Sequence, residues 1–527
     1  MRWTRTDSAL LCALLVFALC MRVPTVARPF ERDPEGCGSF YGILARNYFR
    51  YDWRTTLGVP VQSMGVTPAR PVYYANHPPG VPLLIAGVYA TFGYRADSTW
   101  LPGEWQARLP TTLFTLGCVA LIYLMLRTRA SRRAAAFAAL IFAGVPMTIV
   151  FGSQPDVINS QLVFFALLTV AAYLRFCGSQ TAARAGVLCA ALVPAALTDW
   201  PAFFLVVVLV GHFVLTQPRG KWWRIAPFAA VACLVFALLF AQVVAVKHDW
   251  GWIASLVSRR AMSNISDTHL HFGVRTWLRE AIWLHAIGRH TLPVAMLTVA
   301  WVVMAARRWR ADRATPLVGI LLAWAALHVV VGRQGVFVHE WWWWPLTAGA
   351  AMASGVVVDR LCGFFESRSS NPRMVNVTAA AALLFLSGLN FQKSIEELGR
   401  PKRISRDEFN YSLAEFGRVI RKSSPPNCAV MLAEDDESLP LWYYADRPIK
   451  RKIWDPWTFE HRMSDGVCDL PFALTEPWSE RPVALIVPRV YVSAKLQPLV
   501  EFADEQFERT DSPRFIVFDL RKKKAPR

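Results

Sequence analysis

Long apolar runs separated by polar loops dominate the chain before residue 395. Each run is close to the roughly 20 residues that a helix needs to cross the hydrocarbon core of a bilayer. They predict about 11 membrane-spanning helices, at residues 10–26, 107–126, 134–151, 157–174, 185–199, 201–216, 225–246, 291–306, 315–332, 341–358 and 375–391. The apolar segment 79–93 is too short for a span, opens with two prolines and ends in glycine, so we expect a short helix lying on or dipping into the outer membrane face.

Basic residues are distributed unevenly between the loops. Alternate loops carry Lys and Arg, including RTRASRR at 127–133, whereas the loops near 152–156 and 199–200 carry none. Because loops rich in Lys and Arg stay in the cytoplasm, this pattern predicts a cytoplasmic N-terminus. We therefore expect a multi-pass protein of the cell (inner) membrane, with loops 28–106 and 247–290 and the C-terminal part facing outward.

The pattern changes near residue 396. We expect helices at 407–422 and 493–503 and strands at 429–432, 483–487 and 515–520. This alternation predicts a small extracytoplasmic α/β domain, 396–527, after a membrane module, 1–395. Cys428 and Cys468 both fall in that domain, on the oxidising side of the membrane, so a disulfide between them and two free thiols are equally open.

Composition supports a membrane protein and narrows its function. The 527 residues are 54% hydrophobic and only 18% charged, which is too apolar for a soluble protein of this length. The net charge of +19 comes mostly from loops beside the spans, so the positive-inside rule explains it without nucleic acid. A Walker A loop, a GxSxG elbow, HExxH and a dinucleotide fingerprint are all missing from the sequence, which argues against an ATP-driven pump or a metalloprotease.

The loop after the first span holds the densest candidate chemistry. Asp33 and Glu35, in RDPEG, can act as a base on an acceptor hydroxyl or amine, or they can be ordinary loop charges that cap the next helix. Arg46 and Arg50 lie one helical turn apart, so both can face a phosphate or extend toward lipid headgroups. His77, before two prolines, can hydrogen-bond a phosphate or pass a proton, although a single loop histidine is more often structural.

Further candidates lie at the predicted outer ends of the spans. Asp156, in GSQPD, and Asp199, in TDWP, are acids at a depth where charge is costly, although each can instead cap the helix that follows. Arg108 faces outward against the positive-inside bias, which suits an anionic ligand. In the next long outward loop, Arg259 and Arg260 can grip a lipid phosphate.

Histidines and tryptophans complete the set of candidates. His269 and His271, in HLHF, lack a third partner, so a metal site there has weak support. His339 precedes Glu340 and four tryptophans at 341–344. Such a run is typical of an aromatic belt at the membrane interface, and it also suits an aromatic wall for an isoprenoid or a sugar.

Several of these motifs follow one another in a characteristic order. The chain contains, in sequence, Asp33 and Glu35, ARNY at 45–48, NHPPGVPLL at 76–84, FG at 92–93, ARLPTTLF at 107–114 and QPD at 154–156. In this order the chain resembles the GT-C membrane glycosyltransferases, in particular the bacterial branch of protein O-mannosyltransferase-like and aminoarabinose-transferase-like enzymes. The resemblance covers about residues 1–350.

The resemblance implies an α-helical polytopic membrane protein of the GT-C type. Its expected activity is inverting transfer of a sugar from a polyprenyl-phosphate donor to an acceptor glycan, lipid or protein outside the membrane. Asp33 or Glu35 becomes the base, although the family's acid is often followed directly by Glu and Pro34 intervenes here. With the residues above, the substrate-binding candidates are Arg46, His77, Arg108, Asp156, Arg259, Arg260 and His339. Some GT-C enzymes use a divalent metal and others do not, so the cofactor stays open.

Two other classes of protein stay open as alternatives. A transporter or flippase of envelope lipids uses broken-helix pairs and charges deep within its spans, and the sequence shows neither clearly. A non-catalytic membrane scaffold would use the C-terminal domain to bind partners. Replacing Asp33 separates the enzyme hypothesis from both alternatives.

Overall fold

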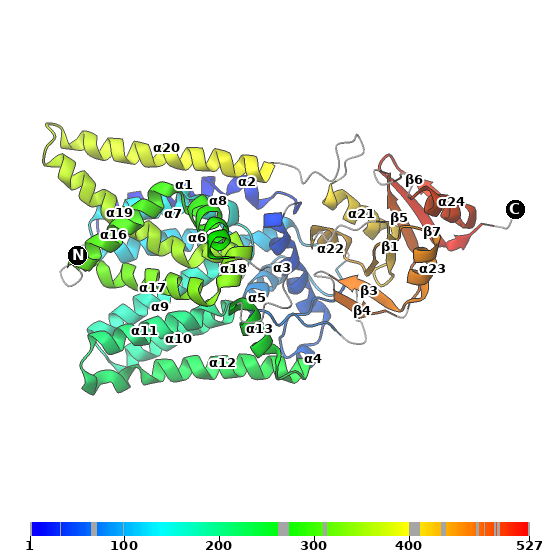
Figure 1. Cartoon of the computed structure of the whole chain (residues 1–527), viewed down its shortest axis with the longest axis horizontal. Helices are drawn as coiled ribbons and strands as arrows, with labels where there is room; N and C mark the ends of the chain where they lie inside the picture. Colours follow the sequence, from blue (N-terminus) through cyan, green and yellow to red (C-terminus); the bar gives the residue numbers. More distant parts are fainter. Residues whose placement is uncertain are drawn as a thin grey trace. The chain divides into compact units, whose positions relative to one another are not determined.

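The apolar runs of the sequence form helices in the computed structural model of the chain (Figure 1). The structure describes residues 3–31, 33–64, 71–98, 100–156, 158–261, 273–308, 313–399, 412–433, 439–470, 474–478, 480–489, 492 and 496–524, with only the backbone described at 33–36, 259–261, 308 and 399. The chain divides into a membrane unit (residues 1–27, 76–81 and 108–399) and a sheet unit (residues 28–75, 82–107 and 400–527).

The membrane unit is built from helices. They are α1 (Arg5–Cys20), α2 (Val23–Val26), α6 (Glu104–Arg127, which belongs to this unit from Arg108 onward), α7 (Arg132–Gly144), α8 (Pro146–Phe151), α9 (Ser160–Gly178), α10 (Ala182–Thr198), α11 (Pro201–Thr216), η1 (Arg219–Ile225), α12 (Ala226–Lys247), α13 (Trp252–Ala261), α14 (Val274–Trp277), η2 (Leu278–Ile287), α15 (Gly288–His290), α16 (Leu292–Arg308), α17 (Thr315–Val331), α18 (Arg333–Val338), η3 (Glu340–Trp343), α19 (Trp344–Glu366) and α20 (Pro372–Gly399).

Every predicted span coincides with one helix or with two consecutive helices. Among the described residues, six are long and apolar enough to cross a bilayer: α1 with α2, α6, α9, η1 with α12, η3 with α19, and α20. Three more apolar helices, α10, α11 and α17, have 16 or 17 residues. The predicted fold class is therefore confirmed, whereas the count of about 11 spans stays a prediction.

One pair of consecutive helical segments is sharply bent, as in a broken span or a re-entrant loop. The helical segments Val274–His290 and Leu292–Arg307 are long and apolar enough to cross a membrane only when taken together, and they are bent by 99°. The bend falls at Thr291, whose φ of 74° is costly for a β-branched residue, and it follows the π-helical segment η2. The segment predicted as the outward loop 247–290 is thus largely helical where the structure describes it.

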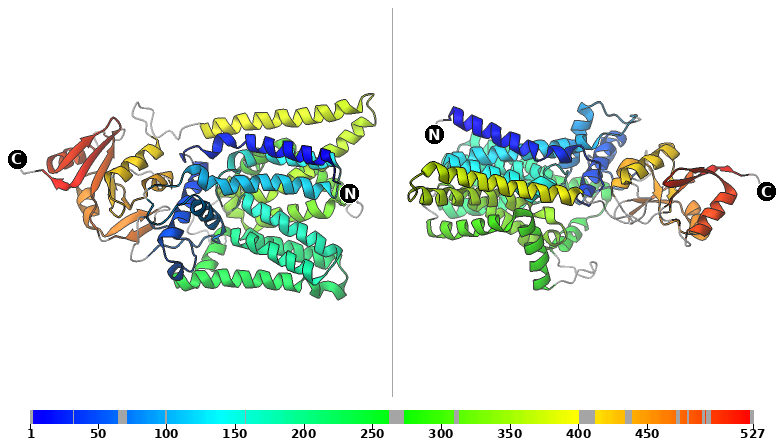
Figure 2. Two further views of the ribbon diagram at one scale, coloured as in Figure 1. Left: turned by 180° about the vertical axis from the view of Figure 1, so that it is seen from behind. Right: turned by 90° about the horizontal axis from the view of Figure 1, so that it is seen from above.

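Small residues let the central helices of the membrane unit approach closely. A Cβ on Gly355 of α19 would lie only 2.6 Å from the carbonyl oxygen of Ala134 in α7. Figure 1 shows α9, α10, α11 and α12 as a neighbouring group, and Figure 2 shows α20, in yellow, along the outside of the unit. Only 6% of the apolar window of α20 is buried, as expected for a helix that faces lipid.

The sheet unit joins the first predicted outer loop to the C-terminal part of the chain. Its helices are α3 (Asp33–Arg50), α4 (Trp53–Thr56), α21 (Leu413–Ser423), α22 (Leu439–Ala445), α23 (Pro456–Ser464) and α24 (Gln497–Gln506), and α5 (Gly80–Thr91) contributes its residues from Pro82 onward. α5 has 12 residues, in agreement with the short helix predicted at 79–93. Whether a domain boundary lies at residue 396 stays a prediction.

A seven-stranded mixed sheet forms the centre of this unit. Its strands are β1 (Val430–Leu432), β2 (Ile449–Lys450), β3 (Val467–Leu470), β4 (Leu474–Pro477), β5 (Ala484–Pro488), β6 (Phe507–Asp511) and β7 (Phe515–Lys523), in the order β4-β3-β2-β1-β5-β7-β6. β1 runs parallel to β2 and β5, and the other pairs are antiparallel. Alternate residues such as Leu485 and Phe518 pack with α23 and α24, whereas Phe515 stacks on Phe416 of α21. Helices therefore cover both faces, which confirms the predicted α/β character.

Contacts from α22 hold the first loop within the sheet unit. The hydroxyl of Tyr443 donates a hydrogen bond of 2.6 Å to the carbonyl oxygen of Pro102, and the hydroxyl of Tyr444 donates one of 2.6 Å to Glu104. The ring of Tyr443 also packs so closely on Gly42 of α3 that a Cβ there would lie 2.6 Å from it. Elsewhere in the unit Cys428 and Cys468 are both free thiols, so the disulfide is not formed.

Candidate active site

Two polar segments that are far apart in the sequence meet in the membrane unit. They are NHPPG, which leads into α5, and TDWP, which joins α10 to α11. The indole Nε1 of Trp200 donates a hydrogen bond of 2.8 Å to the carbonyl oxygen of Asn76. A Cβ on Gly80 would overlap the carbonyl oxygen of Leu197, so glycine is required for the two segments to approach this closely.

His77 and Asp199 form a buried pair at this contact. Nδ1 of His77 lies 2.7 Å from Oδ1 of Asp199. Pro78 and Pro79 restrict the backbone beside His77, and Pro201 begins α11, which leaves Asp199 as the extended C-cap of α10. A hydrogen on Nδ1 leaves Nε2 of a neutral imidazole as an acceptor, and a proton on Nε2 gives an imidazolium that Asp199 stabilises. The pair is therefore suited to binding a phosphate or passing a proton.

An apolar cavity of about 190 Å³ adjoins this pair. His77 and Asp199 line it, together with Ile158 from the loop after α8 and three residues of α13. Aromatic rings form much of the remaining wall, from Trp200, Phe203, Phe204, Phe236 and Trp342. An aromatic, apolar wall beside two ionisable groups suits an amphiphile that has one charged end.

Two buried acceptors that line the cavity lack a hydrogen-bond partner in the part of the chain that the structure describes. Nε2 of His328 donates a hydrogen bond of 3.0 Å to the carbonyl oxygen of Trp342, which leaves Nδ1 as the unpaired acceptor. Oδ2 of Asp199 is unpaired as well. Since an unpaired buried acceptor is costly, a donor group of a bound molecule would stabilise this site. The sequence analysis missed His328, although a single histidine inside an apolar span is a signal for function.

Arg108 and the QPD motif come together as the sequence order suggests. Arg108, in α6, is fully buried, and its Nε donates a hydrogen bond of 3.2 Å to Oε1 of Gln154. Nδ2 of Asn159, the N-cap of α9, donates to the carbonyl oxygens of Phe151 and Gln154 and so fixes the loop. Asp156 is buried in the same loop, two residues before Ile158 of the cavity wall.

The structure does not describe the side chains of several remaining candidates. Asp33 and Glu35 lie in the first turn of α3, so this helix begins earlier than the loop pattern suggests, and their side chains are outside the described part. The same holds for Arg259 and Arg260, at the end of α13, which supplies cavity residues from its earlier turns. His269 and His271 lie outside the described residues.

His339 stacks on the first tryptophan of the following run. The ring centroids of His339 and Trp341 are 4.6 Å apart. The other three tryptophans, at 342–344, are buried, which corrects the expectation of an aromatic belt. Trp342 lines the cavity, and Trp344 packs against Phe142. The run is therefore an internal aromatic wall rather than an interfacial anchor.

Arg46 is placed differently from the prediction that it faces a phosphate. It is fully buried in the sheet unit, where its Nη1 donates a hydrogen bond of 3.0 Å to the carbonyl oxygen of Tyr443 and its Nη2 lies 3.7 Å from Asp446. Arg50 binds the same carboxylate with both terminal nitrogens, at 2.8 and 2.6 Å. Helical spacing correctly put Arg46 and Arg50 on one face, but the anion that they share is Asp446.

Among the described residues, no three His, Cys, Asp or Glu side chains come close enough together to hold an ion. His77 and Asp199 are the nearest approach to such a group in the site, and two ligands are too few for a tight protein-held ion.

One known protein family matches the part of the chain that carries these motifs. Residues 70–248, which include NHPPG, Arg108, QPD and TDWP, match the family of dolichyl-phosphate-mannose-protein mannosyltransferases. No match was found among curated protein sequences.

Similar solved structures cover nearly the whole chain. The crystal structure of ArnT from Cupriavidus metallidurans bound to undecaprenyl phosphate is 18% identical, covers 97% of both chains and superposes with a TM-score of 0.62. The oligosaccharyltransferase AglB from Archaeoglobus fulgidus, in complex with an inhibitory peptide and a dolichol-phosphate, is 11% identical over 96% of this chain and 72% of that chain, with a TM-score of 0.55. The chain therefore has the fold of the GT-C membrane glycosyltransferases, which confirms the resemblance found in its sequence motifs.

Proposed function

We propose that the chain is an inverting glycosyltransferase that moves a sugar from a polyprenyl-phosphate donor to an envelope glycan, lipid or protein on the outer face of the membrane. The GT-C fold and the match over residues 70–248 support this proposal. The observation that carries it is the aromatic cavity beside His77 and Asp199. A polyprenyl phosphate has one anionic end on a long apolar chain, and this site offers a place for each part.

The donor would bind with its phosphate toward His77 and Arg108. In the proposed complex the imidazolium of His77, held by Asp199, and the guanidinium of Arg108 offset the charge of the phosphate. The first isoprenoid units would occupy the aromatic cavity. Undecaprenyl phosphate and dolichol-phosphate in the structures of ArnT and AglB are ligands of this chemical class.

Transfer then needs a base on the acceptor side. Asp33 or Glu35 would take a proton from the acceptor hydroxyl or amine, which attacks the anomeric carbon from the face opposite the phosphate. The bond from the anomeric carbon to the phosphate oxygen breaks, and polyprenyl phosphate leaves as the anion that the cations stabilise. Asp156 is proposed as a second acid of the site, and Arg259, Arg260 and His339 as further contacts to the lipid donor.

A deletion strain tests the proposal. The strain is complemented with wild type, with Asp33→Asn, or with the control Asp52→Asn, which changes an exposed acid of the same loop that lies at the start of α4. Mass spectrometry of envelope glycans and glycolipids should show one sugar that is lost on deletion and restored by wild type and the control only. Full restoration by a well-expressed Asp33→Asn would move the base to Glu35 or Asp156. No change on deletion would favour a transporter or a scaffold.

A further inference from the structure

A second, larger cavity lies in the membrane unit, away from the proposed donor site. Its volume is about 710 Å³, and it is formed by the first residues of the chain, the C-terminal parts of α6 and α9 and the middle of α10. We name it the N-terminal groove. By the positive-inside pattern it lies at the cytoplasmic ends of these helices. Its apolar walls come from Leu121, Leu124, Phe165, Leu168, Val187 and Pro194.

The groove has the depth of one lipid leaflet. Along α9 it extends from Arg175 at the mouth to Phe165, ten residues apart in the sequence. At a rise of 1.5 Å for each helical residue this is about 15 Å, which is half of the roughly 30 Å hydrocarbon core. Leu124 and Val187 are 37% and 57% exposed, so the walls are open to an acyl chain.

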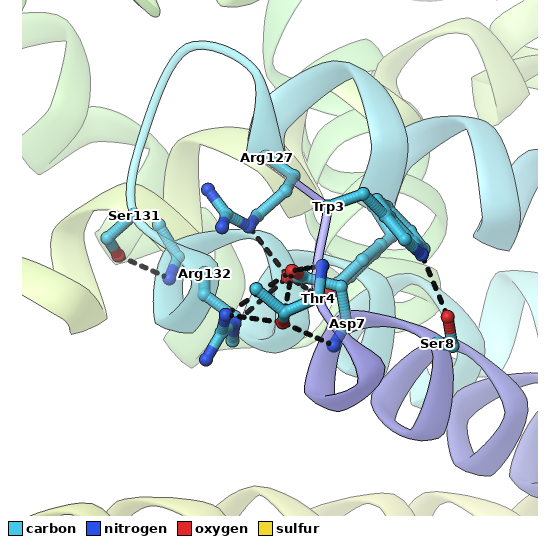
Figure 3. A network of polar contacts seen from close by, with 9 residues as sticks. Trp3, Thr4, Asp7, Ser8, Arg127, Ser131 and Arg132 are labelled. Atoms are coloured by element: carbon cyan, nitrogen blue, oxygen red, sulfur yellow. Dashed lines mark hydrogen bonds and ion pairs between the residues drawn. The ribbon is translucent and has the colours of Figure 1, made fainter. Parts of the chain in front are cut away.

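Three arginines stand at the mouth of the groove: Arg127, Arg129 and Arg175. Figure 3 shows how Arg127 is already paired. Oδ1 of Asp7 accepts hydrogen bonds of 2.7 Å from Nε of Arg127 and 2.9 Å from Nε of Arg132, and a third of 3.0 Å from the hydroxyl of Tyr123. The single carboxylate at the mouth is therefore fully engaged.

Arg129 and Arg175 do not take part in this hydrogen-bond network. Within the described part of the chain, neither side chain has a hydrogen bond or an ion pair. Arg129 is half-buried in the turn between α6 and α7, and this burial lowers its pKa, the direction expected for a guanidinium without an anion. Arg129 is half-buried and Arg175 is exposed, so both guanidinium groups can donate hydrogen bonds to an anion whose hydrocarbon tail lies in the groove.

We propose that the N-terminal groove binds an anionic glycerophospholipid of the surrounding leaflet. Its phosphate would accept hydrogen bonds from Arg129 and Arg175, and its acyl chains would lie along α6, α9 and α10. The leaflet predicted at this end is the cytoplasmic one, which is rich in anionic lipid. Trp3, at the mouth, donates a hydrogen bond to Ser8 and lies edge-on to Tyr123, as an interfacial anchor would.

Native mass spectrometry of the full-length protein in a mild detergent tests this site. Dioleoyl phosphatidylglycerol, dioleoyl phosphatidylcholine and undecaprenyl phosphate are each titrated into wild type and into Arg129→Gln/Arg175→Gln. The control, Arg313→Gln/Arg373→Gln, removes the same charge from two exposed arginines of the predicted cytoplasmic side. Each basic residue near an anionic headgroup contributes a factor of about five in binding, so the double variant should bind phosphatidylglycerol about 30-fold more weakly.

The expected result is that wild type and control prefer phosphatidylglycerol to phosphatidylcholine and that the groove variant loses this preference. If the double variant does not purify, Arg129→Gln and Arg175→Gln alone should each weaken phosphatidylglycerol about fivefold. Equal binding of the two phospholipids by wild type would overturn the proposal, as would an unchanged preference in the variants. A stronger arginine-dependent preference for undecaprenyl phosphate would also overturn it.

Discussion

Asp446→Asn is the most informative single substitution in the sheet unit. The carboxylate accepts both terminal nitrogens of Arg50 and lies 3.7 Å from Arg46, while these three side chains are 7%, 9% and 0% exposed. Asp446 has φ of 49°, a conformation that asparagine adopts at least as readily as aspartate. The substitution therefore keeps the shape and the backbone preference, removes the charge and replaces one of the two acceptor oxygens by an amide donor.

The expected loss of stability is large because two guanidinium groups are left buried without their anion. Breaking a buried pair by removing one partner costs about 3–5 kcal/mol. Burial raises the pKa of Asp446, but the charges of Arg46 and Arg50 outweigh this effect and bring it to about 2. Since the folded-state pKa lies below the ordinary value of 3.8, the contribution is complete above about pH 4 and is lost as the pH falls toward 2.

Asp519→Asn is the matched control. Asp519 forms a two-hydrogen-bond pair with Arg521 at 2.8 and 2.9 Å in the same unit, but the two side chains are 24% and 52% exposed. An exposed pair contributes about 0–1 kcal/mol. Pulse proteolysis of the full-length protein in urea at pH 7 would report on unfolding of the sheet unit for both variants.

Two results would refute this reasoning. If Asp446→Asn and Asp519→Asn lower the free energy of unfolding equally, the buried cluster is not a major source of stability. If Asp446→Asn leaves stability unchanged and instead weakens donor binding, Arg46 belongs to the phosphate site, as its position in the sequence first suggested.

Three further predictions follow from single contacts. Burial raises the pKa of Glu476 to about 7, so the folded state holds a proton that the unfolded chain has lost. The free energy of unfolding should therefore fall by up to about 1.4 kcal/mol for each pH unit between about 4.5 and 7. Urea titrations of Glu476→Gln should lose this slope. Gly80→Ala should lower sugar transfer on the order of 100-fold, since its Cβ displaces His77, whereas Gly87→Ala, with open space around it in the same helix, should match wild type in the same assay. Asp199→Asn should reduce transfer on the order of 100-fold, because His77 loses the carboxylate that holds its ring in place; transfer equal to that of wild type would mean that Asp199 only supports the fold.

Hydropathy predicted the helices well because the bilayer imposes one simple requirement on each span. The sheet unit was harder to predict. The apolar runs at β1, β5 and β7 were found, but β2 has only two residues, and β6 is a charged edge strand of sequence FERTD with four of its five residues exposed. Such strands are held by their neighbours rather than by a local pattern.

The candidate site, too, could be predicted from the sequence only in part. Position at the outer ends of spans made Arg108, Asp156 and Asp199 candidates, and the two prolines after His77 made that loop residue a candidate. The pairing of His77 with Asp199 joins residues 122 positions apart, and no local spacing contains it. For Arg46 the helical spacing gave the correct face, but its partner, Asp446, comes from the far end of the chain.

The most direct test of the proposed reaction follows the donor itself. Lipid extracts from the deletion strain carrying wild type or Asp33→Asn are analysed by mass spectrometry for polyprenyl-phosphate sugars. The account predicts that one such lipid accumulates in the variant strain and that its sugar has the same mass as the sugar lost from the envelope. An envelope sugar that is lost without any accumulated polyprenyl-phosphate sugar would contradict the proposed donor. Unchanged donor and envelope sugars in both strains would contradict the transferase proposal as a whole.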